Sequence, residues 1–479
     1  MSFQKITALG SGLALMLLSG CSVGPKFHQP KVPVPPAYRG STGVNTTPEN
    51  ATASIASLGA EKWSAVFRDP VLQELIREAL ANNYDLKIAA ERVLEAQDQL
   101  GITRAQQLPS LSGGGSYNTI GLTSGLSKIL SSNGSDRHLF SGGFNLSAAW
   151  NLDFWGYYSK QTEAARDQLL ATAWAQRMTV DSLIESVASS YFVLRTLDAE
   201  LAITQKTVTA RRASLQLTEE LEQGGAGTLE AVREAQESLY QATAQIPDLE
   251  RQIAQQEDAL STLLGRNPGP ILRNSLSEVN WPTPEQVPAG IPLQLLQRRP
   301  DIEAADAQLR AANADIGVAR ARFFPQLAIT ATGSTSSNQF KHLLDANNIL
   351  WELTGSLTQS IFNGGSLRNN LRLSKAQEQE QVYTYAQTVQ KAFQNVSDSL
   401  IALRQYRLYR EQQMKLVAAA KDATRLARLN YKAGATSYLS VLTNENTYYQ
   451  AELGLIQARQ QEAVSFVQLY SALGGGWQQ

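Results

Sequence analysis

The sequence of 479 residues contains one large unit twice. Residues 101–109 align with residues 317–325, and residues 187–195 align with residues 396–404. A unit of about 200 residues is much longer than the repeats of solenoid proteins. We therefore expect a two-fold duplication in which both copies have the same fold.

Proline-rich stretches mark the ends of the two copies. Residues 268–292 predict a linker, which gives a first repeat over 63–267 and a second over 293–473. A short tail remains at 474–479. Residues 21–62 are rich in proline, serine, threonine and glycine, which predicts an extended arm.

The hydrophobic period changes in the same order in each copy. Apolar residues of 70–107 recur every three or four positions, which predicts a helix. A strand pair should follow each time, because apolar and polar residues alternate at 144–154, 326–335 and 350–362. Aromatic residues gather near the strand ends, as in the interface girdles of membrane barrels. The alternative is an ordinary half-buried hairpin of a soluble domain.

A very long helix is expected after each strand pair. Residues 157–223 and 366–432 contain no proline or glycine, and their apolar residues form a coiled-coil stripe. About 67 residues at 1.5 Å each give a helix about 100 Å long. Both stretches end at a glycine-containing break and return as a shorter helix, which Thr228 or Ser437 can cap.

The N-terminus has the features of an exported lipoprotein. Residues 1–20 contain one lysine, an apolar stretch and a small-residue ending, which indicate a signal peptide. Residues 18–21 resemble the bacterial lipobox, so we expect a covalent lipid on Cys21. Ser22, rather than an aspartate, implies sorting to the outer membrane. The alternative is a non-lipidated signal peptide with an incidental cysteine.

Composition and motifs disfavour several classes of function. The formal net charge is −1, so there is no electrostatic reason to bind nucleic acid. The single cysteine cannot form a disulfide within the chain. The three histidines are scattered, so a metal site or a cofactor site built on cysteine and histidine is improbable. The chain has no HExxH, P-loop or GxSxG sequence and no other catalytic constellation. We therefore expect neither an enzyme nor a metal site.

The strands imply that several chains assemble if the protein spans a membrane. After the signal peptide, no stretch reaches the ~18 apolar residues of a membrane helix, which leaves β-strands as the spanning elements. Four strands cannot close a membrane barrel, whose observed minimum is about eight. Two chains would give eight strands, and three would give twelve with a usable pore. Helices of about 100 Å extend well beyond the hydrocarbon layer and suit an aqueous conduit.

The sequence resembles the TolC-type outer membrane factors, in particular their OprM-like lipoprotein branch. The matching stretches follow the family's order over nearly the whole mature chain and lie at residues 21–25, 63–70, 296–302, 362–365, 431–442 and 473–477. The resemblance implies a mixed α/β membrane protein that is mainly α. It implies a homotrimer with a 12-stranded outer-membrane β-barrel, four strands per chain, continued by a periplasmic α-barrel of coiled-coil helices.

The resemblance also implies where partners bind. The breaks after the long helices are the tips that meet the periplasmic adaptor, and they carry Gly225, Gly227, Thr228, Gly434, Thr436 and Ser437. Leu439 matches a leucine ring that narrows the periplasmic entrance. Thr443 stands where the family has an acid, and the nearby Glu445 lies on another face of the helix. The alternatives are simple turn chemistry at the tips and a packed hairpin leucine.

The function implied is passive export through the outer membrane. An inner-membrane RND-type transporter and the adaptor would deliver drugs or other small solutes to the channel. One alternative is the same fold in a type I protein secretion system. Another is a lipid-anchored coiled-coil scaffold without a pore.

Overall fold

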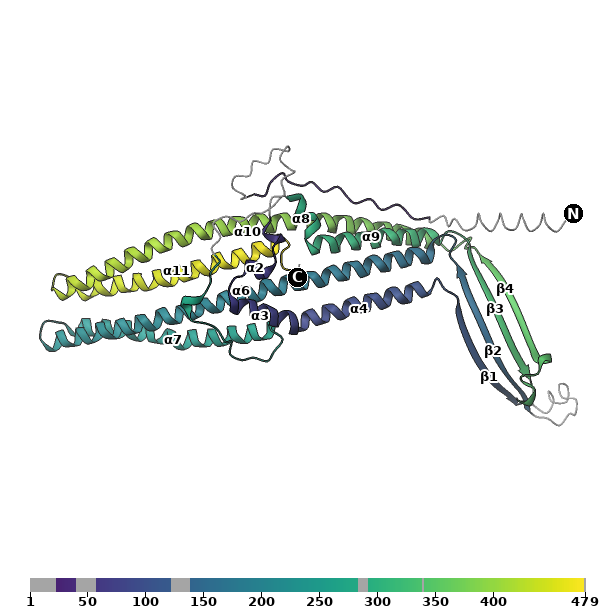
Figure 1. Ribbon diagram of the computed structural model, residues 1–479, viewed down its shortest axis with the longest axis horizontal. Coiled ribbons are helices and arrows are strands. Elements are labelled where there is room, and N and C mark those ends of the chain that lie inside the picture. The colour runs from purple at the N-terminus through teal and green to yellow at the C-terminus, as the bar shows by residue number, and fades with distance from the viewer. Residues whose placement is uncertain (1–22, 40–56, 122–137, 283–291, 338–339, 478–479) are drawn as a thin grey trace. The chain divides into compact units, whose positions relative to one another are not determined.

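The computed structural model describes residues 23–39, 57–121, 138–282, 292–337 and 340–477 (Figure 1). The first repeat contains α2 (Trp63–Val66), α3 (Pro70–Asn82), α4 (Tyr84–Ala105), β1 (Ser110–Gly121), β2 (His138–Leu152), α6 (Tyr157–Gln223) and α7 (Leu229–Leu263). The second contains α8 (Pro292–Arg298), α9 (Pro300–Ala321), β3 (Gln326–Ser337), β4 (Ile349–Thr358), α10 (Ser366–Lys432) and α11 (Tyr438–Ala472). Short 3₁₀ turns lie at Leu58–Ala60, Leu276–Glu278, Phe340–His342 and Ala346–Asn348.

The duplication in sequence is also a duplication in structure. Both long helices, α6 and α10, contain 67 residues, and both returning helices, α7 and α11, contain 35. The bounds expected for α6 and α10 are confirmed at both ends. Among the described residues, none of the helices combines the length and the apolar character needed to cross a membrane.

The chain forms two compact units, each of which draws on both repeats. The first comprises the described parts of Met1–Pro30, Val93–Thr172 and Ala305–Tyr385, and it contains the four strands. The second comprises the described parts of Lys31–Arg92, Ala173–Ala304 and Ala386–Gln479. It contains α7, α11 and the later parts of α6 and α10, with the turns that join them into the helix hairpins α6–α7 and α10–α11.

Two expected boundaries are wrong. The helix expected over 70–107 is broken at Asn83, whose side chain accepts from Leu86 N (3.0 Å) and donates to Leu263 O (2.9 Å). These bonds start a new helix and fix the break to α7. The strand expected over 350–362 ends at Thr358, because Thr358 pairs with Gln326, the first residue of β3; the side chain of Gln359 then donates to Phe323 O (3.0 Å).

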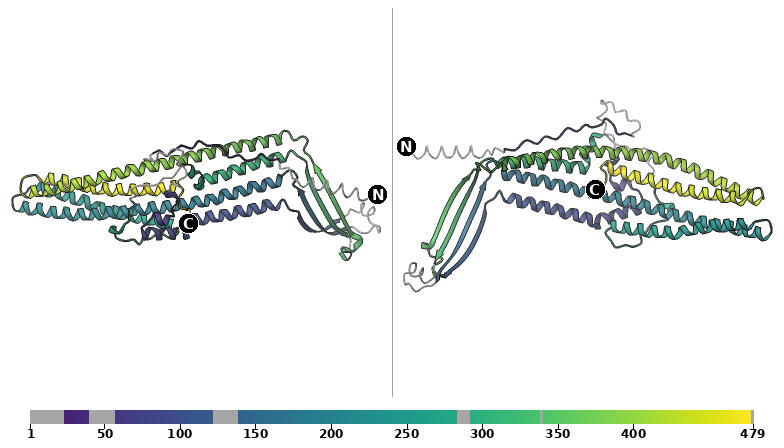
Figure 2. Two further views of the ribbon diagram at one scale, coloured as in Figure 1. Left: turned by 45° about the horizontal axis from the view of Figure 1, so that its top comes forward. Right: turned by 180° about the vertical axis from the view of Figure 1, so that it is seen from behind.

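The four strands form one antiparallel sheet in the order β1-β2-β3-β4, and Figure 2 shows them side by side in two views. Residues paired directly across strands lie on the same face. One such row is Leu111–Ala148–Ala331–Leu353, and the next on this face is Gly113–Leu146–Gly333–Trp351. Most apolar residues of both repeats therefore share one face, as the alternation predicts.

The segment between the repeats is held against α6 by a buried arginine. The side chain of Arg195 is only 2% exposed. Its guanidinium donates to Asp198 Oδ2 (3.0 Å) and to the carbonyl oxygens of Asn274 (2.8 Å) and Ser275 (2.9 Å). Arg273 also donates to both oxygens of Asp198. These bonds satisfy two carbonyl groups of a segment that has almost no regular structure of its own.

Candidate functional site

The first turn, between α6 and α7, is a glycine-based helix ending followed by a capped helix. Gly225 has φ +71°, and Ala226 N donates to Leu221 O (2.8 Å), which closes α6 in the manner of a Schellman motif. A Cβ on Gly227 would lie 2.8 Å from Glu222 N, so the turn has no space for a side chain there. Thr228 caps α7 by accepting from Ala231 N (3.2 Å), as expected.

The second turn, between α10 and α11, ends α10 as the first turn ends α6, but α11 begins differently from α7. Gly434 also has φ +71°, and Ala435 N donates to Asn430 O (2.9 Å). The expectation that the Ser437 side chain caps α11 is wrong, because it makes no cap hydrogen bond. Ser440 N donates instead to the carbonyl oxygen of Ser437 (3.2 Å), so the backbone accepts the bond. Thr436 occupies the position aligned with Gly227.

Leu439 and Thr443 lie on one exposed face of α11, directly after the second turn. Leu439 is 56% exposed within the subunit, which rules out tight packing inside its own hairpin. Thr443 is also exposed, and its hydroxyl donates to Leu439 O (2.9 Å). Both side chains are therefore available to a lumen or to another subunit.

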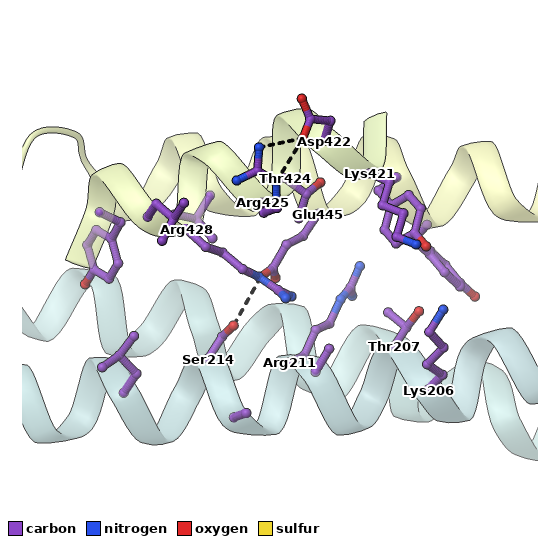
Figure 3. Close-up of a pocket in the computed structure, with 18 of the residues that line it drawn as sticks. Lys206, Thr207, Arg211, Ser214, Lys421, Asp422, Thr424, Arg425, Arg428 and Glu445 are labelled. Carbon is purple, nitrogen blue, oxygen red and sulfur yellow. Dashed lines mark hydrogen bonds and ion pairs between the residues drawn. The ribbon is translucent and has the colours of Figure 1, made fainter. Parts of the chain in front are cut away.

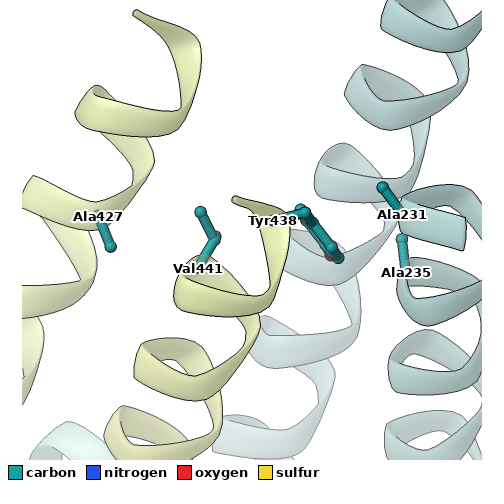
Figure 4. Packing of buried hydrophobic residues seen from close by; sticks show 5 residues of the cluster. All are labelled: Ala231, Ala235, Ala427, Tyr438 and Val441. Carbon is teal, nitrogen blue, oxygen red and sulfur yellow. The ribbon is translucent and has the colours of Figure 1, made fainter. Parts of the chain in front are cut away.

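Just behind the turns, a small apolar cluster joins the two hairpins (Figure 4). Tyr438, at the start of α11, is buried with Ala231 and Ala235 of α7, and with Ala427 and Val441. The alanines leave room for the tyrosine ring between the helices. This cluster fixes the start of α11 against the first hairpin.

Further from the turns, a buried polar network also connects the hairpins. Glu445 of α11 is 5% exposed and accepts from Arg428 Nε (2.8 Å) and from the Ser214 hydroxyl of α6 (3.1 Å). Arg211 of α6 is 3% exposed and donates to Asn446 Oδ1 (2.6 Å) and to Ser238 O (2.5 Å). The network thus links α6 with α7, α10 and α11. Burial lowers the pKa of the Arg211 guanidinium, which Glu445 partly offsets.

Four residues of the network line a cavity of about 850 Å³ between α6 and the second hairpin, namely Arg211, Ser214, Arg428 and Glu445 (Figure 3). Arg211 and Ser214 of α6 face the side of α11 that carries Glu445. At the far end of the cavity, Lys206 pairs with Glu452 (3.2 Å). The cavity therefore separates the hairpins, and a few polar contacts bridge it.

Sequence reasoning located the turns but did not identify this network. Glu445 was expected to lie on a different face from Leu439, and the structure places it in the buried network, where it cannot contribute to an acidic ring. Arg211 was missed. A usable signal was present, because Arg211 aligns with Ala420 and Glu445 aligns with Gln236 in the other repeat. A charge found in only one of two duplicated helices indicates a contact specific to that copy.

Comparison with known proteins identifies the family. The family model described as "Outer membrane efflux protein" matches residues 75–266 and again residues 291–475. The chain belongs to the outer membrane efflux protein family. It is therefore an outer-membrane protein that serves as an exit channel for efflux, and the expected resemblance is confirmed.

Relatives match this efflux protein over almost their whole length. The solvent efflux pump outer membrane protein SrpC of Pseudomonas putida is 36% identical over 97% of both chains. The cation efflux system protein CusC of Escherichia coli K12 is 33% identical over 96% of this chain and 97% of its own. The solved open-state structure of the Neisseria gonorrhoeae MtrE outer membrane channel superimposes with a TM-score of 0.84 at 30% identity, covering 95% of this chain and 99% of MtrE.

Proposed function

We propose that three copies of the chain assemble into a passive outer-membrane duct that receives small solutes from a periplasmic adaptor and an inner-membrane RND-type transporter. The observation that carries this proposal is the four-stranded sheet. Within the described part of the chain, β1 and β4 each have one neighbouring strand, and one face exposes apolar side chains such as Trp351 and Leu353. Open strand edges cost several kcal/mol per unpaired group in lipid, so neighbouring subunits must pair them.

Three chains are favoured over two because a duct needs a lumen. Eight strands enclose an interior that side chains fill, whereas twelve leave an open pore. In this assembly the helix hairpins extend into the periplasm. The two turns, with Gly225, Gly227, Thr228, Gly434, Thr436 and Ser437, contact the adaptor. Leu439 and Thr443 line the periplasmic entrance.

Small-solute efflux is favoured over type I protein secretion and over a scaffold without a pore. The full-length relatives are named for the efflux of solvents and cations, and the MtrE relative is named as a channel. The protein acts as a conduit and not as an enzyme, and it needs no cofactor besides a covalent lipid.

Conductance in planar bilayers tests the duct directly. The purified wild-type protein should give small stepwise conductances, because the leucine ring at Leu439 narrows the periplasmic entrance. Leu439→Ala should raise the step size at least about twofold, since it removes most of an exposed side chain at the narrowest point. If neither the wild type nor the Leu439→Ala variant gives stepwise conductance, the proposal is contradicted.

The lipid on Cys21 is a separate part of this proposal, and Cys21 lies outside the described residues. Its support is the lipobox-like sequence at 18–21. Cells grown with labelled palmitate should incorporate the label into the wild type, and Cys21→Ser should lose nearly all of it. Equal labelling of both proteins would show that the lipid is absent from this residue.

A further inference from the structure

The face of the sheet opposite most of the apolar residues is mainly polar, although Ile120 and Leu350 also lie on it. Its rows across the four strands include Ser110–Ala149–Thr330–Thr354 and Ser112–Ser147–Thr332–Glu352. Hydroxyl groups therefore dominate one face, and large apolar side chains dominate the other. In a membrane barrel the apolar face contacts lipid, which places the hydroxyl-rich face toward the lumen.

A single carboxylate stands on this polar face. Glu352 is the only Asp, Glu, Lys or Arg in β1–β4 as the structure describes them. It is exposed within the subunit, and the Thr354 hydroxyl donates to its Oε1 (2.9 Å). No strand residue of opposite charge lies within the described sheet to neutralise it.

Glu352 lies toward the end of β4 that is away from α10. β4 begins at Ile349, after the connection from β3, and its other end, Thr358, leads toward α10. Glu352 is the fourth residue of the strand, so it is close to the end that connects to β3. In the proposed orientation, with the helices in the periplasm, this end is the external mouth of the barrel.

We propose that Glu352 is a selectivity-determining residue of the duct, which forms a ring of three carboxylates in the lumen near the external mouth. The ring favours cations and positively charged solutes and disfavours anions. This inference rests on the proposed trimeric channel and adds to it a preference for charge.

The size of the barrel makes such a ring effective at low salt. Twelve strands about 4.8 Å apart and tilted by about 40° enclose a backbone ring about 12 Å in radius. The carboxylates extend inward from this ring, so they lie within the Debye length of about 30 Å at 0.01 M salt. At 1 M salt the Debye length falls to about 3 Å, and the ring no longer influences the axis of the pore.

Reversal potentials in a KCl gradient test the proposal. All proteins carry Leu439→Ala, which widens the periplasmic entrance and so limits its contribution to the measured K⁺/Cl⁻ permeability ratio. At about 10 mM salt, Glu352→Gln should lower the K⁺/Cl⁻ permeability ratio about threefold, and Glu352→Lys should lower it further. The differences should vanish near 1 M salt.

A matched control separates the ring from general charge at the mouth. Asp345 lies in the connection before β4 and pairs with His342 (2.7 Å), so Asp345→Asn removes the same charge outside the strands. It should change the ratio much less than Glu352→Gln. An equal effect of both variants, or no effect of Glu352→Gln in a conducting channel, overturns the inference and leaves the duct intact. Absence of conductance overturns both.

Thiol labelling tests the lumen face without relying on current. Glu352→Cys should react readily with a cationic, membrane-impermeant thiosulfonate in intact cells. Trp351→Cys, on the apolar face, should react at least about tenfold more slowly because lipid covers it. The unsubstituted chain measures any reaction of Cys21. Faster labelling at position 351 than at 352 would reverse the assignment of faces and overturn the proposal.

Discussion

Arg211→Ala is expected to increase the single-channel conductance severalfold in planar bilayers. Arg211 is buried on α6 and bonds to Ser238 of α7 and Asn446 of α11 beside a large cavity. Its loss leaves Ser238 O and the Asn446 side chain without these bonds, at a cost of about 1–3 kcal/mol. Few other polar contacts bridge the hairpins there, so the two hairpins should separate more often. Their separation should widen the periplasmic entrance and raise the conductance.

The neighbouring Arg212 provides the control, because it is exposed on the same helix. Arg212→Ala removes the same charge and should leave the conductance near that of the wild type. If both variants behave alike, or if Arg211→Ala lowers the conductance, the network does not restrain the entrance.

Arg195→Ala is expected to release the segment between the repeats. The buried guanidinium has three partners, and its removal leaves two carbonyl oxygens and Asp198 without their bonds to it. Breaking such a buried charged contact typically costs about 3–5 kcal/mol. Protease cleavage within residues 268–282 should therefore become at least about 100-fold faster, if cleavage follows local opening.

Arg404 is the control for this experiment, since it aligns with Arg195 in the second repeat. Its side chain is exposed, and Arg404→Ala should leave cleavage of residues 268–282 unchanged. Acceleration by Arg404→Ala, or resistance of the Arg195→Ala protein, would contradict the role assigned to Arg195.

Arg195 and Arg404 also show why sequence could predict the elements better than the contacts. Long stretches without proline or glycine, ended by Gly225 and Gly434, predicted α6 and α10 to the residue. These signals are local. Nothing local distinguishes the two aligned arginines, because burial of Arg195 depends on a segment that lies about 80 residues further along the chain.

The missed boundaries have partly the same origin. Asn83 caps the helix after the break through Leu86 N, which is a local contact, but its bond to Leu263 O joins it to a distant helix. Where β4 ends, Gln359 bonds to the Phe323 carbonyl, which is also distant in sequence. The glycines and Thr228 of the turns could be predicted because they act on their own backbone, whereas Arg211 and Glu445 act between helices.

The number of chains in the detergent-extracted complex tests the central claim most directly. Native mass spectrometry should show three copies of the mature polypeptide, because one sheet supplies a third of a wall that closes only at twelve strands. A folded, stable species containing a single copy, with its strand edges unpaired, would contradict the account.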